Sequence, residues 1–304
     1  MAFRLDVQFE PTHELINSLH AFICRSSHKK IDLSSSWAEM ARKSLTLDFA
    51  NMLDETDIDA DWKLTFLLVH LCPDKTEIAG FLSWLENLST GEMYELIAEY
   101  SNYFPENMGK FRSKSLALFE QWNEFYFKNI KPEILTSLHE EKKSRQDKLP
   151  HMNAESFVDS TTNGLMFKPI SGLEELILIP QYHFQPINVI FHFGRMTLCC
   201  YSARIYFSDN DESINPHNYR MLRSVGEKSR LKILRYLNQG PRSFIEIVRY
   251  LKLSKGITHD HISNLRRAGL IYAHFEGETL TEYSLRPSGL EDMQRNLLEY
   301  ISGH

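Results

Sequence analysis

The chain has 304 residues, of which 42% are apolar and 24% charged, and this length and composition predict a folded protein of about two domains. They exclude a disordered tail, a collagen-like fibre and a disulfide-stapled miniprotein. Because no apolar run approaches the ~20 residues that span a bilayer, no export signal opens the chain and the four cysteines lack CxxC spacing, we expect a cytoplasmic protein with no membrane partner.

Charge is divided unevenly along the chain. The net charge is −6, but residues 216–304 hold 14 Lys and Arg against 9 Asp and Glu. Of the totals of 34 basic and 40 acidic residues, this leaves 20 basic and 31 acidic residues for positions 1–215. A basic segment joined to an acidic one is typical of a nucleic-acid-binding module attached to a different domain, although clustering by chance gives the same balance.

Residues 1–210 have the pattern of a mainly helical domain with a small β-sheet. Residues 3–9 alternate apolar and polar side chains, which predicts a strand, and Pro11 stands where a helix begins. Helical spacing of apolar residues then continues to about residue 167, interrupted by proline and glycine. After the first helix we expect helices at Trp37–Leu53, Trp62–Leu71, Ile78–Leu88, Met93–Tyr103, Phe111–Phe127 and Ile134–Lys148.

Between residues 174 and 207 the apolar period changes to two, and Gly194 separates the last two runs as a hairpin turn does. Together with the N-terminal strand, these runs predict a small sheet that completes the first domain. The polar, acidic segment 208–216 is the expected linker to a second domain at 216–304. The expected strands are Leu176–Ile179, Asn188–Phe193 and Met196–Tyr201.

No metal, cofactor or catalytic site is predicted. His259 and His261 are two residues apart on an expected helix, so their side chains point ~200° apart and cannot hold one ion. Cys199 and Cys200 point to opposite faces of a strand, which predicts one buried thiol rather than a joint site. The usual motifs for nucleotide binding, zinc proteolysis and serine hydrolysis do not occur.

The basic segment opens with two short helices, Tyr219–Val225 and Lys228–Leu237, and we expect Leu231, Leu234 and Leu237 to face the core. A helix-turn-helix pattern follows. Ser243 and Glu246 form a capping box that opens a helix through Leu251, and Ser254 caps a second helix, Lys255–Ala268, which Gly269 ends. The core face of this second helix is expected to hold Thr258, Ile262 and Leu265.

Two further runs, Leu270–Phe275 and Thr279–Leu285, predict a β-hairpin, which directly after such a helix is a wing. Pro287 then starts a last helix with a stripe of apolar residues. That stripe packs either on its own domain or on a partner subunit, and we favour the partner. The stripe consists of Leu290, Met293, Leu297 and Ile301.

These residues resemble a known family. Residues 229–237 (SRLKILRYL) are similar to the second helix of ArsR-type winged-helix regulators, and residues 253–271 (LSKGITHDHISNLRRAGLI) closely resemble their recognition helix and its exit. The resemblance implies a dimeric, sequence-specific DNA-binding transcription regulator, often a repressor that a signal releases. The N-terminal part looks like the helical extension attached to some ArsR-like regulators.

Two departures from the family pattern matter. ArsR-type metal sensors commonly carry a Cys-x-Cys pair in the helix before the recognition helix, but residues 243–251 (SFIEIVRYL) contain no cysteine, so metal sensing is not carried over. Asp260 stands where many relatives have a basic or polar contact residue. An aspartate accepts a hydrogen bond from the amino group of cytosine but is repelled by phosphate, and its role stays open.

The expected DNA contacts come from the recognition helix and the segment before it. Lys255 lies in the first helical turn, where a cation is unfavourable for the helix dipole, so a phosphate explains it better. His259 and Asn264 lie on the polar face and suit base edges, whereas His261 suits contact and packing equally. The expected set is Ser254, Lys255, Gly256, His259, His261, Asn264 and Arg267, with Arg242, Lys228 and Arg286 as candidate contacts of low specificity to the DNA backbone.

We therefore expect a homodimeric transcription regulator, a repressor and not an enzyme, that binds a palindromic operator in double-stranded DNA. Residues 1–210 would sense a small-molecule effector or mediate assembly. Two other hypotheses stay open. In the first, the N-terminal domain binds a protein partner without any small ligand. In the second, the chain is an enzyme whose winged helix serves only protein contact.

Overall fold

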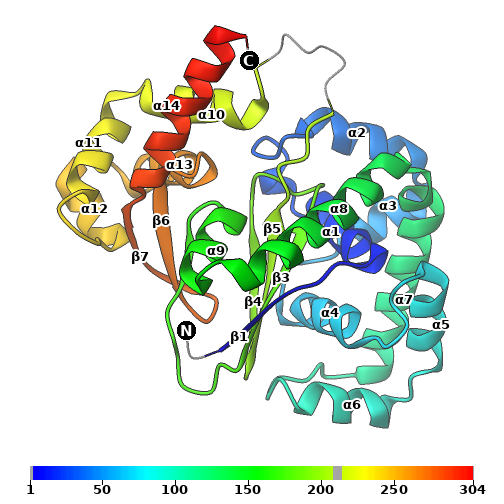
Figure 1. Ribbon diagram of the computed structural model, residues 1–304. Coiled ribbons are helices and arrows are strands. Elements are labelled where there is room, and N and C mark those ends of the chain that lie inside the picture. The colour runs from blue at the N-terminus through cyan, green and yellow to red at the C-terminus, as the bar shows by residue number, and fades with distance from the viewer. Residues whose placement is uncertain (1–2, 208–213, 304) are drawn as a thin grey trace. The chain divides into compact units, whose positions relative to one another are not determined.

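The computed structural model describes residues 3–207 and 214–303, which form two compact units (Figure 1). The N-terminal unit holds the residues up to 147 together with 172–205, and the C-terminal unit holds 148–171 together with the residues from 206 onward. This part of the chain is mainly helical with two small sheets, so the predicted α+β class is confirmed. None of its helices combines the length and the apolar character needed to cross a membrane.

The helices of the N-terminal unit follow the sequence pattern closely, with two differences. The helix expected at Met93–Tyr103 ends at Ala98, where the chain turns. The segment expected as a single helix at Trp37–Leu53 is two helices, because Leu45 is extended and Thr46 caps a new helix by accepting a hydrogen bond from the Phe49 amide. The helices are α1 (Pro11–Ile23), α2 (Ser34–Ser44), α3 (Leu47–Asp54), α4 (Ala60–Leu71), α5 (Ile78–Asn87), α6 (Thr90–Ala98), α7 (Met108–Phe125) and α8 (Pro132–Lys148).

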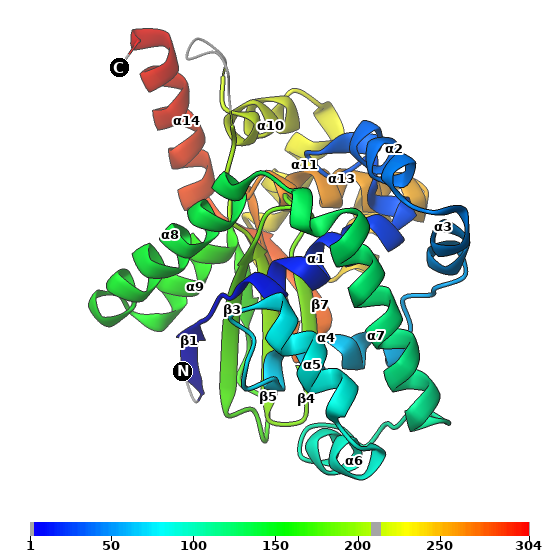
Figure 2. The same cartoon turned by 90° about the vertical axis from the view of Figure 1, so that its right-hand side faces the viewer.

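The sheet of this unit has the order β1-β3-β5-β4. β1 (Arg4–Val7), β3 (Glu175–Gln181) and β5 (Met196–Ser202) are parallel, and β4 (Val189–Phe193) turns back into β5 at Gly194, as expected. Figure 2 shows α1, α4, α5 and α7 over one face of the sheet. The expectation of one buried thiol is wrong: Cys199 and Cys200 are both buried, because β5 is an interior strand whose side chains are buried on both faces.

The C-terminal unit contains a segment that the sequence pattern assigned to the first domain. Residues 148–171 form α9 (Ala154–Thr162) and β2 (Leu165–Phe167), where helical spacing was expected up to residue 167. β2 pairs in parallel with β6 (Ile271–Glu276), which gives a sheet of order β2-β6-β7 with β7 (Thr279–Leu285). The observed units therefore differ from a single division at 210–216. Of the expected linker, residues 208–213 lie outside the described residues.

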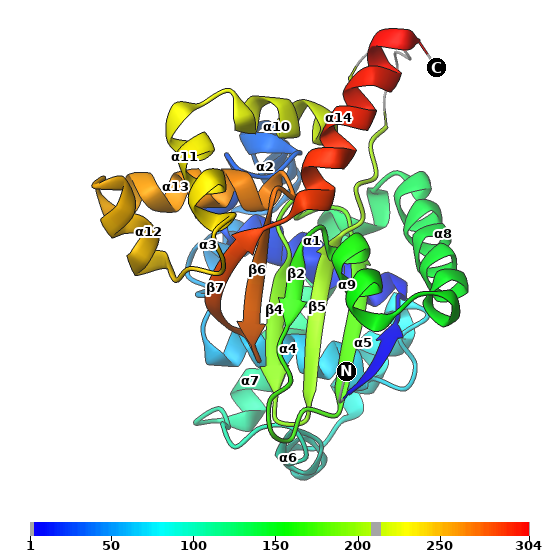
Figure 3. The same ribbon diagram turned by 60° about the vertical axis from the view of Figure 1, so that its left-hand side comes forward.

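The remaining elements of the unit are the expected winged helix-turn-helix (Figure 3). Its helices lie together at one end of the β6–β7 hairpin. α11 and α12 contact β7, and α13 contacts β6. They are α10 (Pro216–Val225), α11 (Lys228–Leu237), α12 (Phe244–Leu251), α13 (Lys255–Arg267) and α14 (Pro287–Ser302).

A buried ion pair joins α9 to this winged helix. Arg286, which is 4% exposed, donates from Nε to Asp159 Oδ1 at 2.6 Å and from Nη1 to the carbonyl of Gly269 at 2.9 Å. Gly269 ends α13 with φ +67°, and a Cβ on Gly289 of α14 would collide with the same carbonyl. The guanidinium therefore holds α9, the end of α13 and the start of α14 at one point. Because it is buried there, the expectation that Arg286 contacts the DNA backbone is wrong.

Loss of one partner from this pair should destabilise the C-terminal unit strongly. We expect Arg286→Met to lower the free energy of unfolding by ~2–4 kcal/mol, because it leaves the mostly buried Asp159 carboxylate without its cation. Urea unfolding of the full chain measures this change. The control is Arg295→Met, since Arg295 pairs with Asp292 on the surface of α14 and such pairs contribute at most ~1 kcal/mol. Equal losses in the two variants would contradict the argument, and Asp159→Leu should restore part of the loss in Arg286→Met.

Candidate nucleic-acid interface

The helix-turn-helix is built on a compact apolar core. Ile233, Leu234 and Leu237 of α11 are buried with Ile247 of α12. Leu231 was expected in this core, but it is 49% exposed, because the buried stripe of α11 passes through Ile233 two residues away. α12 begins at the predicted capping box, in which Ser243 accepts from the Glu246 amide and the Glu246 carboxylate accepts from the Ser243 amide. The prediction of this box is confirmed.

α12 and α13 are joined by a tight turn in which Lys252 has a positive φ of 57°. Ser254 caps α13 as predicted, since its hydroxyl accepts a hydrogen bond from the Ile257 amide at 3.3 Å. Lys255 and Gly256 follow, both exposed, and Lys255 makes no ion pair within the residues that the structure describes. The start of α13 therefore presents free amide groups, the positive end of the helix dipole and a cation to solvent, which together suit an anion such as phosphate.

The core face of α13 is the expected one, with Thr258, Ile262 and Leu265 buried. Asp260 lies on the opposite side, about 200° round the helix from Thr258 at 3.6 residues per turn. Its side chain is 72% exposed. Ile257 is also half exposed. Neither Asp260 nor Ile257 was among the expected DNA contacts, although the helical period that predicts the buried stripe also places Asp260 opposite it.

The other predicted side chains of α13 differ in what they face. His259 is exposed, with its ring 6.4 Å from that of Phe244. His261 is mostly buried, with Nδ1 3.6 Å from Glu227 Oε2, so it packs against the start of α11. Asn264 donates to the Asp260 carbonyl at 2.8 Å and accepts from Arg267 Nη2 at 2.8 Å, so these two side chains hold each other along the helix.

Arg242 lies at the base of the wing. Its amide and carbonyl exchange hydrogen bonds of 2.8 Å with those of Tyr283 on β7, and its guanidinium lies 4.8 Å from the ring centroid of Tyr236. It is part of the scaffold that fixes α12 against the hairpin. Its side chain lies beside this half-buried aromatic ring rather than in the core.

The wing itself carries acidic residues at its tip, which reads Glu276-Gly277-Glu278. Lys168, which follows β2, donates to Glu282 Oε2 at 2.9 Å and lies 3.4 Å from Glu276 Oε1. The hydrogen bond to Glu282 raises the pKa of Lys168. This hairpin is thus linked to β2, and its tip is less suited to phosphate than the start of α13.

Comparison with known families gives an independent result for this segment. Residues 227–273 match the sequence model of the family described as bacterial regulatory protein, arsR family. The C-terminal part of the chain carries an ArsR-family helix-turn-helix domain. Such a domain indicates a DNA-binding transcription regulator. Neither the search of curated proteins nor that of solved structures gave a match.

Outside the ArsR-family domain, the N-terminal unit contains a buried polar network. The Glu14 carboxylate lies 2.5 Å from His183 Nδ1 and accepts from the His183 amide at 2.9 Å. His183 Nε2 lies 2.8 Å from the Tyr126 hydroxyl, which accepts from Trp37 Nε1 at 2.6 Å. Burial raises the pKa of Tyr126. These bonds satisfy a buried carboxylate and fix the segment after β3, which is a structural role.

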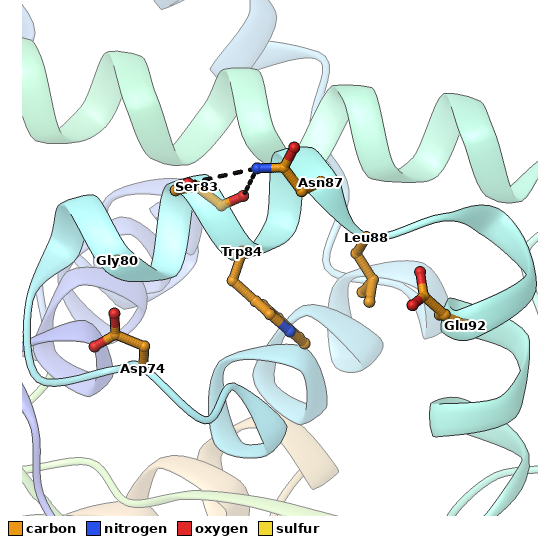
Figure 4. A pocket seen from close by; sticks show the side chains of 7 residues that line it. All are labelled: Asp74, Gly80, Ser83, Trp84, Asn87, Leu88 and Glu92. Carbon is orange, nitrogen blue, oxygen red and sulfur yellow. Dashed lines mark hydrogen bonds between the residues drawn. The ribbon is translucent and has the colours of Figure 1, made fainter.

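The N-terminal unit also has two open pockets. One of about 560 Å³ lies between α4 and α7, where Asp57, Asp61 and Lys110 surround buried Trp62 and Phe111. The other, of about 460 Å³, lies beside α5 (Figure 4) and is lined by Asp74, Gly80, Ser83, Trp84, Asn87, Leu88 and Glu92. Among the described residues, no cluster of three or more His, Cys, Asp or Glu is placed to hold a metal ion.

Glu227 makes the stability of the ArsR-family domain depend on pH. Its carboxylate caps α11 by accepting from the Arg230 amide at 2.9 Å. Partial burial opposes ionisation, but hydrogen bonds from the amides of Ser229 and Arg230, with nearby His261, lower the pKa of Glu227 below its ordinary 4.5. A lowered pKa in the folded state means that the carboxylate stabilises the domain above pH 4.5 and loses this effect as pH falls through the folded value.

We therefore expect Glu227→Gln to reduce the free energy of unfolding above pH 4.5 and to approach the wild-type value below it. The reduction should stay below ~1 kcal/mol, because the carboxylate is partly exposed to solvent. Urea unfolding of both proteins across a pH series measures the difference. Glu291→Gln, an exposed acid of α14, serves as the control and should show no such pH dependence. A constant difference at all pH values would rule out the ionised cap.

Proposed function

We propose that this protein is a homodimeric transcriptional repressor that binds a palindromic operator through α13. The observation that carries the proposal is the exposed start of α13, where Lys255, Gly256 and the cap Ser254 present a cation and free amides to solvent on a rigid ArsR-family domain. His259 and Asn264 are proposed to face base edges, with Arg267 and Arg242 contacting the DNA backbone. His261 supports α13 from the side of α11.

The proposed dimer uses α14 and α10. Asn296 of α14 donates to Asn218 of α10 at 2.9 Å, and the first part of the α14 stripe, at Met293 and Leu297, is half-buried. The last turn is different, because Leu298 and Ile301 are 56% and 70% exposed. Apolar side chains in that position favour a second copy of the chain. Two recognition helices held ~34 Å apart would enter successive major grooves on one face of the duplex.

The N-terminal unit is proposed to control this spacing. A small effector in the pocket between α4 and α7, which combines polar walls with an apolar floor, would shift the population towards or away from the DNA-binding form. The alternative is that this unit binds a protein partner, for which its acidic composition provides a surface. The two hypotheses are distinguished by adding a protein-free, small-molecule fraction of cell extract to the complex with the operator. Loss of operator binding supports the small effector over the protein partner.

DNA binding is tested by Lys255→Glu in the full chain. We expect affinity for duplex DNA to fall roughly tenfold or more for all sequences, because a phosphate contact is replaced by repulsion. The slope of the logarithm of the binding constant against the logarithm of the salt concentration should become shallower by about one. Fluorescence anisotropy over a salt series measures both. Lys143→Glu, an exposed lysine of α8, makes the same charge change away from α13 and should bind as the wild type does. Equal effects of the two changes, or no binding by the wild type, would contradict the proposal.

The dimer is tested by Ile301→Glu. A charge in an apolar interface should shift the chain to the monomer in sedimentation velocity and weaken binding to a palindrome more than binding to a single half-site. The control is Glu299→Lys, which changes a charge on the same exposed turn without altering the apolar residues. A wild-type protein that is monomeric when bound to its operator would overturn this part of the proposal.

A further inference from the structure

Asp260 is the one acidic side chain of α13, and it occupies the centre of the helix surface that faces away from the core. Its carboxylate lies 4.0 Å from His259 Nδ1 and has no hydrogen bond within the described residues. It caps no helix and supports no packing. If α13 enters the major groove, this carboxylate is directed at base edges, with phosphates on either side.

A carboxylate in that place is useful for one kind of contact. It accepts hydrogen bonds only, so it needs a donor on a base edge, and phosphates repel it. In the major groove the donors are the N4 amino group of cytosine and the N6 amino group of adenine, but adenine also presents the acceptor N7 beside its donor. Repulsion by N7 makes adenine the poorer partner. Cytosine is the base that an aspartate selects.

The neighbours of Asp260 allow the short side chain to reach that base. Gly256 and Ser263 lie four residues before and three residues after it, which places them beside it on the same helix face. A Cβ on Gly256 would meet nothing within 4 Å, so the free protein has no steric need for glycine there. A glycine costs up to ~1 kcal/mol relative to alanine within a helix. A close approach of DNA to this face accounts for it.

We propose that Asp260 is a specificity-determining residue that accepts a hydrogen bond from a cytosine amino group in each operator half-site, and that Gly256 and Ser263 allow α13 to approach closely enough. This proposal rests on the proposed function, since it requires that α13 binds DNA. The base that this site selects is cytosine. Because the carboxylate and the phosphates are both negative, their repulsion also weakens binding to DNA that lacks the cytosine.

The experiment selects DNA fragments from a random library with the full-length wild type, Asp260→Asn and Asp260→Ala. The wild type should enrich cytosine at one position of each half-site, with a preference of roughly 5- to 150-fold over other bases. Asp260→Asn should enrich adenine at that position, because an amide pairs with adenine N6 and N7. Asp260→Ala should lose the preference there and keep it elsewhere. Glu86→Gln, which removes an exposed acid from the N-terminal unit, is the matched control for charge and should leave every position unchanged.

An unchanged base preference in Asp260→Ala would overturn the proposal, and so would a loss spread evenly over all positions, which would show a general charge effect. If the wild type selects no DNA at all, the proposed function fails instead. Circular dichroism checks that each variant is folded. As a second measurement, Gly256→Val should weaken binding to the selected site at least about tenfold while binding to random DNA changes less, since a side chain there keeps the helix away from the base edge. Equal affinity of Gly256→Val and wild type would contradict the close approach.

Discussion

The buried contact of Arg286 with Asp159 is the interaction on which the C-terminal unit depends. A cation in the interior is stable only with a close anion and with its other donors satisfied, and here the second acceptor is the carbonyl of Gly269 at the end of α13. The position of α13 is therefore tied to α9, which comes about 100 residues earlier. This explains why residues 148–171 belong to the same unit as the winged helix.

The two units are joined at more than one point of the chain. The chain passes between the two units at residue 147, again at 171 and again at 205, so they are connected three times rather than by one linker. The strands β3, β4 and β5 lie between the second and third connections. If the proposed effector shifted that sheet, the chain itself would carry the shift to both the segment that holds α9 and the segment that leads to α10.

The start of α13 and the tip of the wing differ in charge. The cation and free amides gather at the start of α13, whereas the wing tip is acidic and is compensated by Lys168, which follows β2. In the proposed function, affinity for phosphate and the reading of bases would therefore both depend on α13. Asp260 fits that division, because a carboxylate surrounded by phosphates is tolerable only where it gains a specific hydrogen bond.

Local patterns along the chain predicted much of this structure. The caps at Ser243 and Ser254, the helix end at Gly269 and the buried face through Ile262 all follow from neighbours within four residues, and the structure confirms them. The pairing of Leu165–Phe167 with Ala273–Phe275 and the contact between Asp159 and Arg286 join residues more than 100 positions apart. The spacing of apolar residues in a helix or strand does not predict such partners, because the energy of a buried pair depends on which surfaces the folded chain brings together. The local pattern also failed to predict the exposure of Leu231 and the burial of both Cys199 and Cys200, because these depend on packing against distant elements.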